Sequence, residues 1–134
     1  MRLTRIQRRF ALAPESVAEA RRLPEEARDR IDSARAEDLR LVLSELVTNV
    51  LKHSGLGSEG WVEVRLEACA EFVRGEVEDP SPGFEPSPVL SPTPEQNGGR
   101  GLFVVDRLVS RWGVRATESG SCVWFEMGFE PPYE

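Results

Sequence analysis

The segment Leu39-Arg40-Leu41-Val42-Leu43-Ser44-Glu45-Leu46-Val47-Thr48-Asn49-Val50-Leu51-Lys52-His53-Ser54-Gly55 has the residue spacing of an amphipathic helix. Glu45, Asn49 and His53 are four residues apart, so they form a polar stripe along one edge of the helix. Gly55 is a residue type at which helices commonly end. The apolar residues recur at steps of three and four, which places them together on one face: Leu39, Val42, Leu43, Leu46 and Val50.

The polar stripe has two interpretations. A carboxylate, an amide and an imidazole beside a buried surface are suited to a ligand that combines a metal ion with phosphate. The same stripe could equally be the solvated edge of an ordinary helix, and His53 could be a histidine without a ligand. The rest of the chain must decide between them.

Composition and charge limit the class of protein. The chain has 134 residues, of which 40% are hydrophobic and 30% charged, as expected for a single globular domain over residues 1–134. No run approaches the roughly 18 apolar residues of a membrane span, and the basic start lacks the apolar segment of a secretory signal. A net charge of −6 argues against nucleic-acid binding by bulk electrostatics. Cys69 and Cys122 are expected to be free thiols in the cytoplasm.

The order of predicted elements indicates the fold class. The segment 24–31 is highly charged and expected to be exposed, Ser16 is a candidate helix cap, and the central helix is expected to begin near Ala36. A proline-rich stretch over 80–99 excludes helix and central strand. We predict an α+β two-layer sandwich with helices on one face of a mixed, largely antiparallel sheet. The predicted strands are 5–12, 61–67, 72–79, 111–117 and 121–129. One further helix is opened by residues 14–16 and either ends near Leu23 or restarts at Pro24, and another spans 101–109.

Three further features accompany the central helix. Asp79 ends a predicted strand and is followed by a turn with Gly83, where a carboxylate could accept hydrogen bonds from an amine such as that of adenine. The same residues fit an ordinary Asp-Pro turn. A small polar residue in the segment Glu118–Trp124 could also reach a ligand, but a hairpin turn explains that segment equally well.

The third feature is the glycine-rich start of an apolar helix, Gly98-Gly99-Arg100-Gly101-Leu102. Glycines allow successive backbone N–H groups to converge on one point, and a helix N-terminus adds its dipole, so this segment could bind phosphate. It matches neither the dinucleotide-binding fingerprint nor the P-loop, and a plain loop-to-helix junction has the same residues.

In combination these segments resemble the Bergerat-fold (GHKL) ATP-binding superfamily of type II topoisomerase B subunits, histidine-kinase catalytic domains and mismatch-repair ATPases. The chain looks most like the bacterial anti-sigma-factor serine kinases over nearly its whole length. The segment Ser44–Asn49 resembles their N box, Asp79 with Gly83 the G1 box, and Gly99–Leu102 the G2 box. Segments 111–114 and 123–125 resemble their closing strands.

The resemblance implies a Bergerat-type sandwich and an Mg·ATP-dependent serine/threonine kinase. Its partners would be a small antagonist (anti-anti-sigma) protein as substrate and a sigma factor that is alternatively sequestered, without direct nucleic-acid or membrane contact. Family members commonly form homodimers. Glu45 would be the general base and Asn49 would coordinate Mg²⁺ bound to ATP. The remaining residues implied in nucleotide binding are Lys52, His53, Asp79, Gly83, Gly99, Arg100, Gly101, Leu102 and Cys122.

This sequence departs from the family pattern in places. Pro80 and Pro82 stiffen the G1 region and remove two N–H donors, and Cys122 stands where many relatives have a threonine hydroxyl. The main alternative is therefore a non-catalytic protein-interaction module with the same fold. A detached histidine-kinase catalytic domain is a third interpretation, which the short proline-rich lid disfavours because it has no helix for a dimerisation domain.

Overall fold

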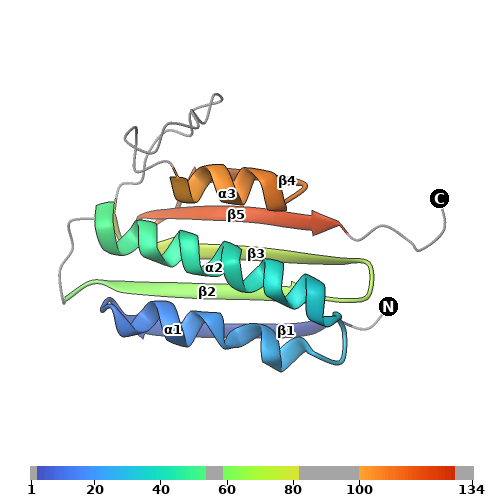
Figure 1. Ribbon diagram of the computed structural model, residues 1–134. Coiled ribbons are helices and arrows are strands. Elements are labelled where there is room, and N and C mark those ends of the chain that lie inside the picture. The colour runs from blue at the N-terminus through green and yellow to red at the C-terminus, as the bar shows by residue number, and fades with distance from the viewer. Residues whose placement is uncertain (1–2, 54–58, 82–99, 129–134) are drawn as a thin grey trace.

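The computed structural model describes residues 3–53, 59–81 and 100–128. Helices lie on one face of a five-stranded sheet whose strand order is β1-β2-β3-β5-β4 (Figure 1). Every strand pairing is antiparallel, so the α+β prediction is confirmed, while the described strands include no parallel pair that would make the sheet mixed. The elements are β1 Thr4–Ala11, α1 Glu15–Arg21, the 3-10 helix η1 Leu23–Ala27, α2 Ser33–His53, β2 Trp61–Ala68, β3 Phe72–Asp79, α3 Arg100–Leu108, β4 Arg111–Ala116 and β5 Ser121–Gly128.

The core lies between the helices and the sheet. Leu39, Leu43 and Leu46 of α2 are at most 2% exposed, as the helical spacing predicts. Alternate residues of β2 and β3 meet them from the sheet, including Val64 and Val77. Helix α2 packs against α1, α3 and β3, so it is the element on which the second layer is built.

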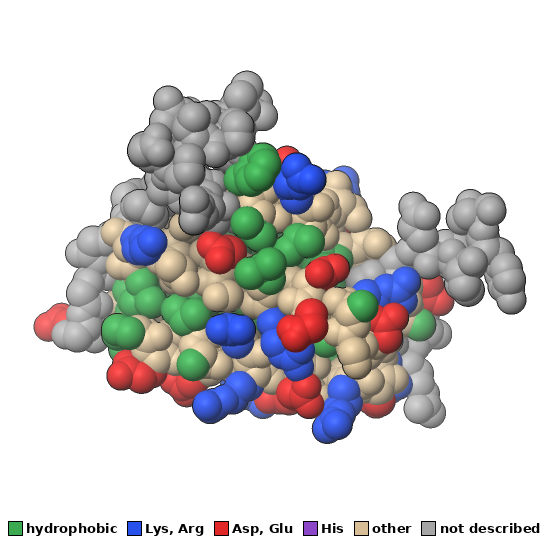
Figure 2. Space-filling model, viewed as in Figure 1, with side chains coloured by type: hydrophobic (Ala, Val, Ile, Leu, Met, Phe, Trp, Pro, Cys, Tyr) green, Lys and Arg blue, Asp and Glu red, His purple; other side chains and the backbone are tan. Residues whose placement is uncertain are grey.

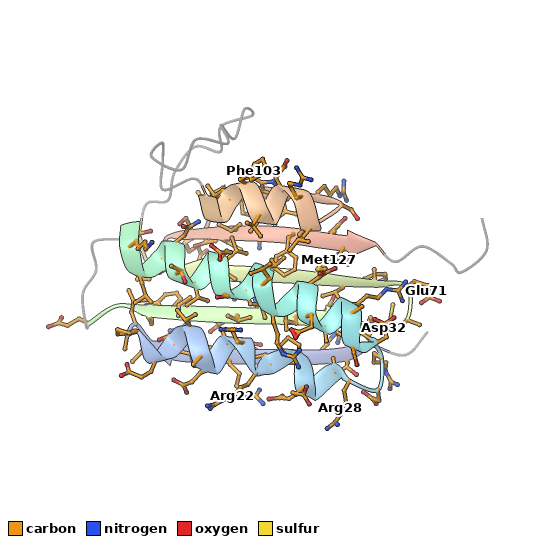
Figure 3. The ribbon with its side chains drawn as sticks, viewed as in Figure 1. Arg22, Arg28, Asp32, Glu71, Phe103 and Met127 are labelled. Carbon is orange, nitrogen blue, oxygen red and sulfur yellow. The ribbon has the colours of Figure 1, made fainter. Side chains whose placement is uncertain are left out.

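Helix α2 begins at Ser33, three residues before the predicted start. Asp32 caps it, because its Oδ1 accepts the backbone N–H of Arg35 at 2.9 Å (Figure 3). The apolar spacing that locates a helix starts only at Ala36, so the exposed first turn carries no periodic signal.

Two expectations for the N-terminal segment are wrong. Ser16 does not cap α1: its hydroxyl donates to the Ala11 carbonyl at 2.5 Å and accepts the N–H of Ala13, so it fastens the turn after β1. The segment 24–31 is not uniformly exposed, because its apolar members face the core between charged ones. These buried residues are Pro24, Ala27 and Ile31.

The sheet face opposite the helices carries charged side chains. Arg65 donates hydrogen bonds to Glu63, Glu76 and Glu78 at 2.6 to 2.8 Å. Arg115 donates to the second oxygen of Glu76 at 2.7 Å. These ion pairs bridge β2, β3 and β4, so this face is charged and internally neutralised. None of the described helices is long and apolar enough to cross a membrane.

Candidate functional site

The polar stripe of α2 is partly accessible. Glu45 and Asn49 are half-buried and lie one turn apart on the same side of the helix. Glu45 forms no ion pair or hydrogen bond with any described side chain, whereas Glu37 on the same helix pairs with Arg40 at 3.3 Å. No described residue therefore competes for the carboxylate of Glu45.

Asp79 ends β3 with its side chain on the helix-covered side of the sheet. It shares that side with Val73 and Val77, because residues an even number apart along a strand point the same way, and it is 7% exposed. Its Oδ1 accepts the backbone N–H of Ser81 at 2.8 Å, and no described residue donates to Oδ2. One oxygen thus fixes the carboxylate and the other remains an acceptor.

The N-terminal end of α3 lies at the same end of the molecule. Arg100 and Gly101 form its first turn, in which backbone N–H groups have no partner within the helix. Leu102 is 6% exposed and packs in the core, so its side chain anchors this turn to the sheet. Gly83 and Gly99, two predicted nucleotide contacts, lie outside the described residues.

These elements converge at one end of the fold. The C-terminal end of α2, the end of β3 and the start of α3 are all on the left in Figure 1, and α2 packs against both α3 and β3. Asn49, Asp79 and Leu102 are therefore brought to one region. Lys52 is exposed in the last turn of α2, and His53 is the final residue of that helix.

Cys122 is not brought to this region. In β5, Phe125 and Met127 point into the core, so the alternation of the strand directs Cys122 to the opposite face. There it lies in register between Glu78 and Arg115. Burial raises the pKa of its thiol to about 11, and the nearby charges of Arg115 and Glu76 act in opposite directions on it.

Ser121 occupies the position that Cys122 was expected to fill. It is 5% exposed, lies opposite Asp79 across the β3–β5 pairing, and shares the inward side of β5 with Phe125. Period-two alternation counted back from Phe125 would have selected Ser121 from the sequence. The sequence also did not indicate Gly120 as a residue that contacts Asp79. A Cβ at this position would lie 2.2 Å from the Asp79 carbonyl oxygen and 2.5 Å from Pro80 Cα.

Comparison with known protein families gives the identity of this arrangement. The family model of the histidine kinase-like ATPase domain matches residues 10–127. The chain belongs to this family. The match spans all elements that carry the candidate site, from α2 to the inward residues of β5, and it confirms the predicted membership of the Bergerat-fold superfamily.

This ATPase domain is similar to individual proteins and solved structures. An uncharacterized protein of Streptomyces coelicolor, SCO4941, is 32% identical over 95 residues, which are 69% of this chain and 87% of that protein. Among solved structures, the RsbU and RsbW domains of Rv1364c from Mycobacterium tuberculosis have a TM-score of 0.64 and 19% identity. That alignment covers 95% of this chain and 33% of the mycobacterial chain, so this chain spans a third of that structure.

A second solved structure has the same architecture. The catalytic domain of the histidine kinase ThkA has a TM-score of 0.53 and 18% identity, with 96% of this chain and 97% of that domain covered. At these identities the two structures confirm the fold. The chain is an ATP-binding domain with a kinase-like fold.

The residues present fit Mg·ATP by the chemistry of their donors. Mg²⁺ prefers oxygen ligands and keeps few protein contacts when phosphates supply the others. In the described part of the chain, no three His, Cys, Asp or Glu side chains gather into a metal site. A single amide oxygen, that of Asn49, together with phosphate oxygens would satisfy this preference, and Asp79 Oδ2, to which no described residue donates, suits an amine donor.

Proposed function

We propose that this ATPase domain is an Mg·ATP-dependent protein kinase that phosphorylates a serine or threonine of a partner protein. Its substrate would be a small antagonist protein and its second partner a sigma factor, so that phosphorylation exchanges one partner for the other. The proposal is supported by the half-buried carboxylate of Glu45, which pairs with no described residue and lies one turn from Asn49, at the end of the fold where Asp79 and α3 meet.

Each site residue has a separate task in this proposal. Asp79 accepts a hydrogen bond from the adenine amine and thereby selects the base. The first turn of α3, including Arg100, Gly101 and Leu102, offers backbone N–H groups to the phosphates. Asn49 would hold Mg²⁺ through its amide oxygen, and the metal would neutralise charge on the phosphate oxygens. Lys52 and His53, at the end of α2, are close enough along the helix to assist.

Glu45 acts on the protein substrate. The hydroxyl oxygen of the substrate forms a bond to the γ-phosphorus, the bond from that phosphorus to the β–γ bridging oxygen breaks, and ADP leaves. The hydroxyl proton passes to the carboxylate of Glu45. A carboxylate already neutralised by an arginine would be a weaker acceptor, which is why the absence of an ion pair at Glu45 among the described residues supports this role.

Nucleotide binding is tested first, by calorimetric titration with a non-hydrolysable ATP analogue and Mg²⁺. We expect binding, an increase in melting temperature at millimolar analogue, and a loss of affinity in Asp79→Asn. Asp29→Asn is the control, because Asp29 is exposed and, among the described residues, pairs only with its neighbour Arg30. The absence of both heat and stabilisation would instead favour a non-catalytic interaction module.

Phosphoryl transfer is tested with γ-labelled ATP and a heat-treated soluble extract of the source cells, in which endogenous kinases are inactive. We expect labelled phosphoserine or phosphothreonine on a small protein. Glu45→Gln should reduce the rate by a factor of about 10² to 10⁴, the range for a general base. Glu19→Gln, a change at an exposed glutamate of α1, should leave the rate unchanged. Full activity of Glu45→Gln would exclude Glu45 as the base.

A further inference from the structure

One large apolar side chain of α2 faces solvent directly beside the candidate base. Leu41 is 43% exposed, whereas Leu39 and Leu43 on either side of it are at most 1% exposed. Leu41 precedes Glu45 by four residues, so the two side chains are neighbours on the same side of the helix. Asn49 lies one turn beyond Glu45 in the opposite direction. Glu45 therefore has the metal-binding amide on one side and an exposed leucine on the other.

Helix α3 packs against α2 and carries further apolar side chains. The carboxylate of Asp106 accepts the indole N–H of Trp112 at 3.0 Å, which turns that side of α3 toward β4. Val104 and Leu108 are each two residues from Asp106, so they lie on the other side of α3, facing α2. Both are partly exposed. Phe103 does not contribute, because it points away from α2 (Figure 3).

Together Leu41, Val104 and Leu108 form a surface that we name the apolar strip. Figure 2 shows hydrophobic side chains gathered over the junction of α2 and α3, between acidic side chains. In the described part of the chain, Leu41 and Leu3 are the exposed large hydrophobic residues, and Leu3 lies at the start of β1. The exposure of Leu41 is therefore unusual for this protein.

Uncompensated negative charge flanks the apolar strip. Asp38 is exposed and lies one turn before Leu41, and Glu45 lies one turn after it. Neither carboxylate pairs with a described residue. Arg40, the nearest cation on α2, is engaged by Glu25 and Glu37 on the side of η1. Along this side of α2, the acidic Asp38 is followed by the apolar Leu41 and then by the acidic Glu45.

We propose that the apolar strip is the docking surface for the protein substrate, and that the substrate presents an apolar side chain followed by a lysine or arginine beside its serine or threonine. This inference rests on the proposed kinase function and adds the recognition chemistry. The substrate's apolar side chain packs on Leu41, its cation pairs with Asp38, and its hydroxyl reaches Glu45. Nucleotide and substrate approach Glu45 from opposite sides, toward Asn49 and toward Leu41.

The geometry of α2 sets the spacing between the apolar residue, the basic residue and the hydroxyl of the substrate. Leu41 and Glu45 are about 6 Å apart along the helix axis, and Asp38 and Glu45 about 10 Å, at 1.5 Å per residue. An extended peptide advances about 3.3 Å per residue. The apolar residue should therefore lie about two positions from the phosphorylated hydroxyl, and the basic residue about three positions from it on the same side.

The test is a positional-scanning library of peptides with one central serine, phosphorylated by the full chain with γ-labelled ATP. Wild type should select an apolar and a basic residue at the stated spacing. Leu41→Ser should raise KM for the selected peptide about tenfold, as expected for loss of a buried leucine contact, without changing kcat or KM for ATP. Asp38→Asn should remove the basic preference, and that preference should weaken with added salt in wild type.

Two variants serve as matched controls. Leu3→Ser removes the other exposed leucine, and Glu19→Gln removes an exposed acidic side chain on α1; both should retain the wild-type peptide preference. An unchanged preference in Leu41→Ser would overturn the proposal. So would a change in the sedimentation of the free chain on Leu41→Ser, because the strip would then contact a second copy.

The outcomes separate this inference from the function on which it rests. If the chain binds the ATP analogue and phosphorylates protein but selects no peptide, the docking proposal is overturned and the kinase function stands. If the chain does not bind the analogue, the kinase function fails and the docking proposal fails with it.

Discussion

Gly120 packs against the backbone of Asp79 so closely that a Cβ at position 120 would lie 2.2 Å from the Asp79 carbonyl oxygen. Two hydrogen bonds close the turn that contains Gly120. The N–H of Gly120 donates to Thr117 Oγ1, and the carbonyl of Gly120 accepts the N–H of Thr117, both at 2.9 Å. The β4–β5 turn therefore packs directly against the backbone that carries the carboxylate proposed to bind adenine.

Gly120→Ala should consequently displace Asp79. The contact is with backbone atoms, which cannot rotate away, so we expect a loss of about 1–3 kcal/mol in the free energy of unfolding and a weaker affinity for the ATP analogue. Urea unfolding and calorimetric titration measure the two effects. Gly75→Ala is the control: its Cβ would meet the Phe125 ring at 2.2 Å, so it should destabilise the core without a specific effect on affinity.

Arg65 holds three carboxylates on the sheet face opposite the helices, and its removal leaves them facing one another. Glu63 and Glu78 are only 10% and 14% exposed at their side chains, so water compensates them poorly. Arg65→Met should reduce the free energy of unfolding by about 2 kcal/mol. Arg5→Met on the same face should change it by less than about 0.5 kcal/mol, because Arg5 is 73% exposed. Equal effects would contradict the central role of Arg65.

The same ion pairs predict how stability depends on pH. Burial opposes ionisation of Glu76, but hydrogen bonds and charges of Arg115 and Arg65 outweigh it and lower its pKa. The pKa of Glu63 is lowered in the same way by Arg9 and Arg65. Both contributions are present above the ordinary carboxyl pKa of about 4.3 and are lost as pH falls below it. Urea midpoints from pH 7 to pH 3 should fall more steeply in wild type than in Arg65→Met.

The fold was predictable because its signals are local and periodic. The alternation in β3 predicted its bounds, Phe72–Asp79, without error, and the spacing in α2 predicted its buried face. The start of α2 was not predictable from periodicity, since the Asp32 cap precedes the first apolar residue. The buried role of Ser16 depends on the Ala11 carbonyl, a contact that only the folded chain provides.

The site was only partly predictable. The four-residue step of Glu45 and Asn49 predicted that they share one side of α2. The alternation of β3 predicted that Asp79 ends the strand, and only the family resemblance implied its place near them. The family pattern implied a nucleotide contact at Cys122, whereas strand alternation, which reverses the side with every residue, directs Ser121 and not Cys122 to the side of Asp79. The closeness of Gly120 to Asp79 joins residues far apart in sequence, so no local pattern indicates it.

The thiol of Cys122 should be unreactive in the native protein. Cys122 is fully buried, and this burial raises the pKa of the thiol to about 11, so little thiolate forms at pH 8.5. Because this pKa is above that of an unfolded cysteine, about 8.5, stability should decline as pH rises from about 9 to 11. Iodoacetamide labelling read by peptide mass spectrometry should modify Cys122 only in urea. Rapid labelling of the native chain would contradict the buried position.

Ser121 and Cys122 provide a direct test of which side of β5 faces the nucleotide. The two residues are adjacent, both are at most 5% exposed, and strand alternation directs them to opposite faces of the sheet. Ser121→Ala removes a hydroxyl on the side of Asp79, so it should weaken the affinity for the ATP analogue several-fold, consistent with about 1 kcal/mol for a neutral hydrogen bond. Cys122→Ala removes a buried sulfur beside Arg115, so it should lower stability and leave affinity unchanged. The opposite result in calorimetric titration would place the nucleotide contact at Cys122 and would require the strand to pair one residue out of the observed register.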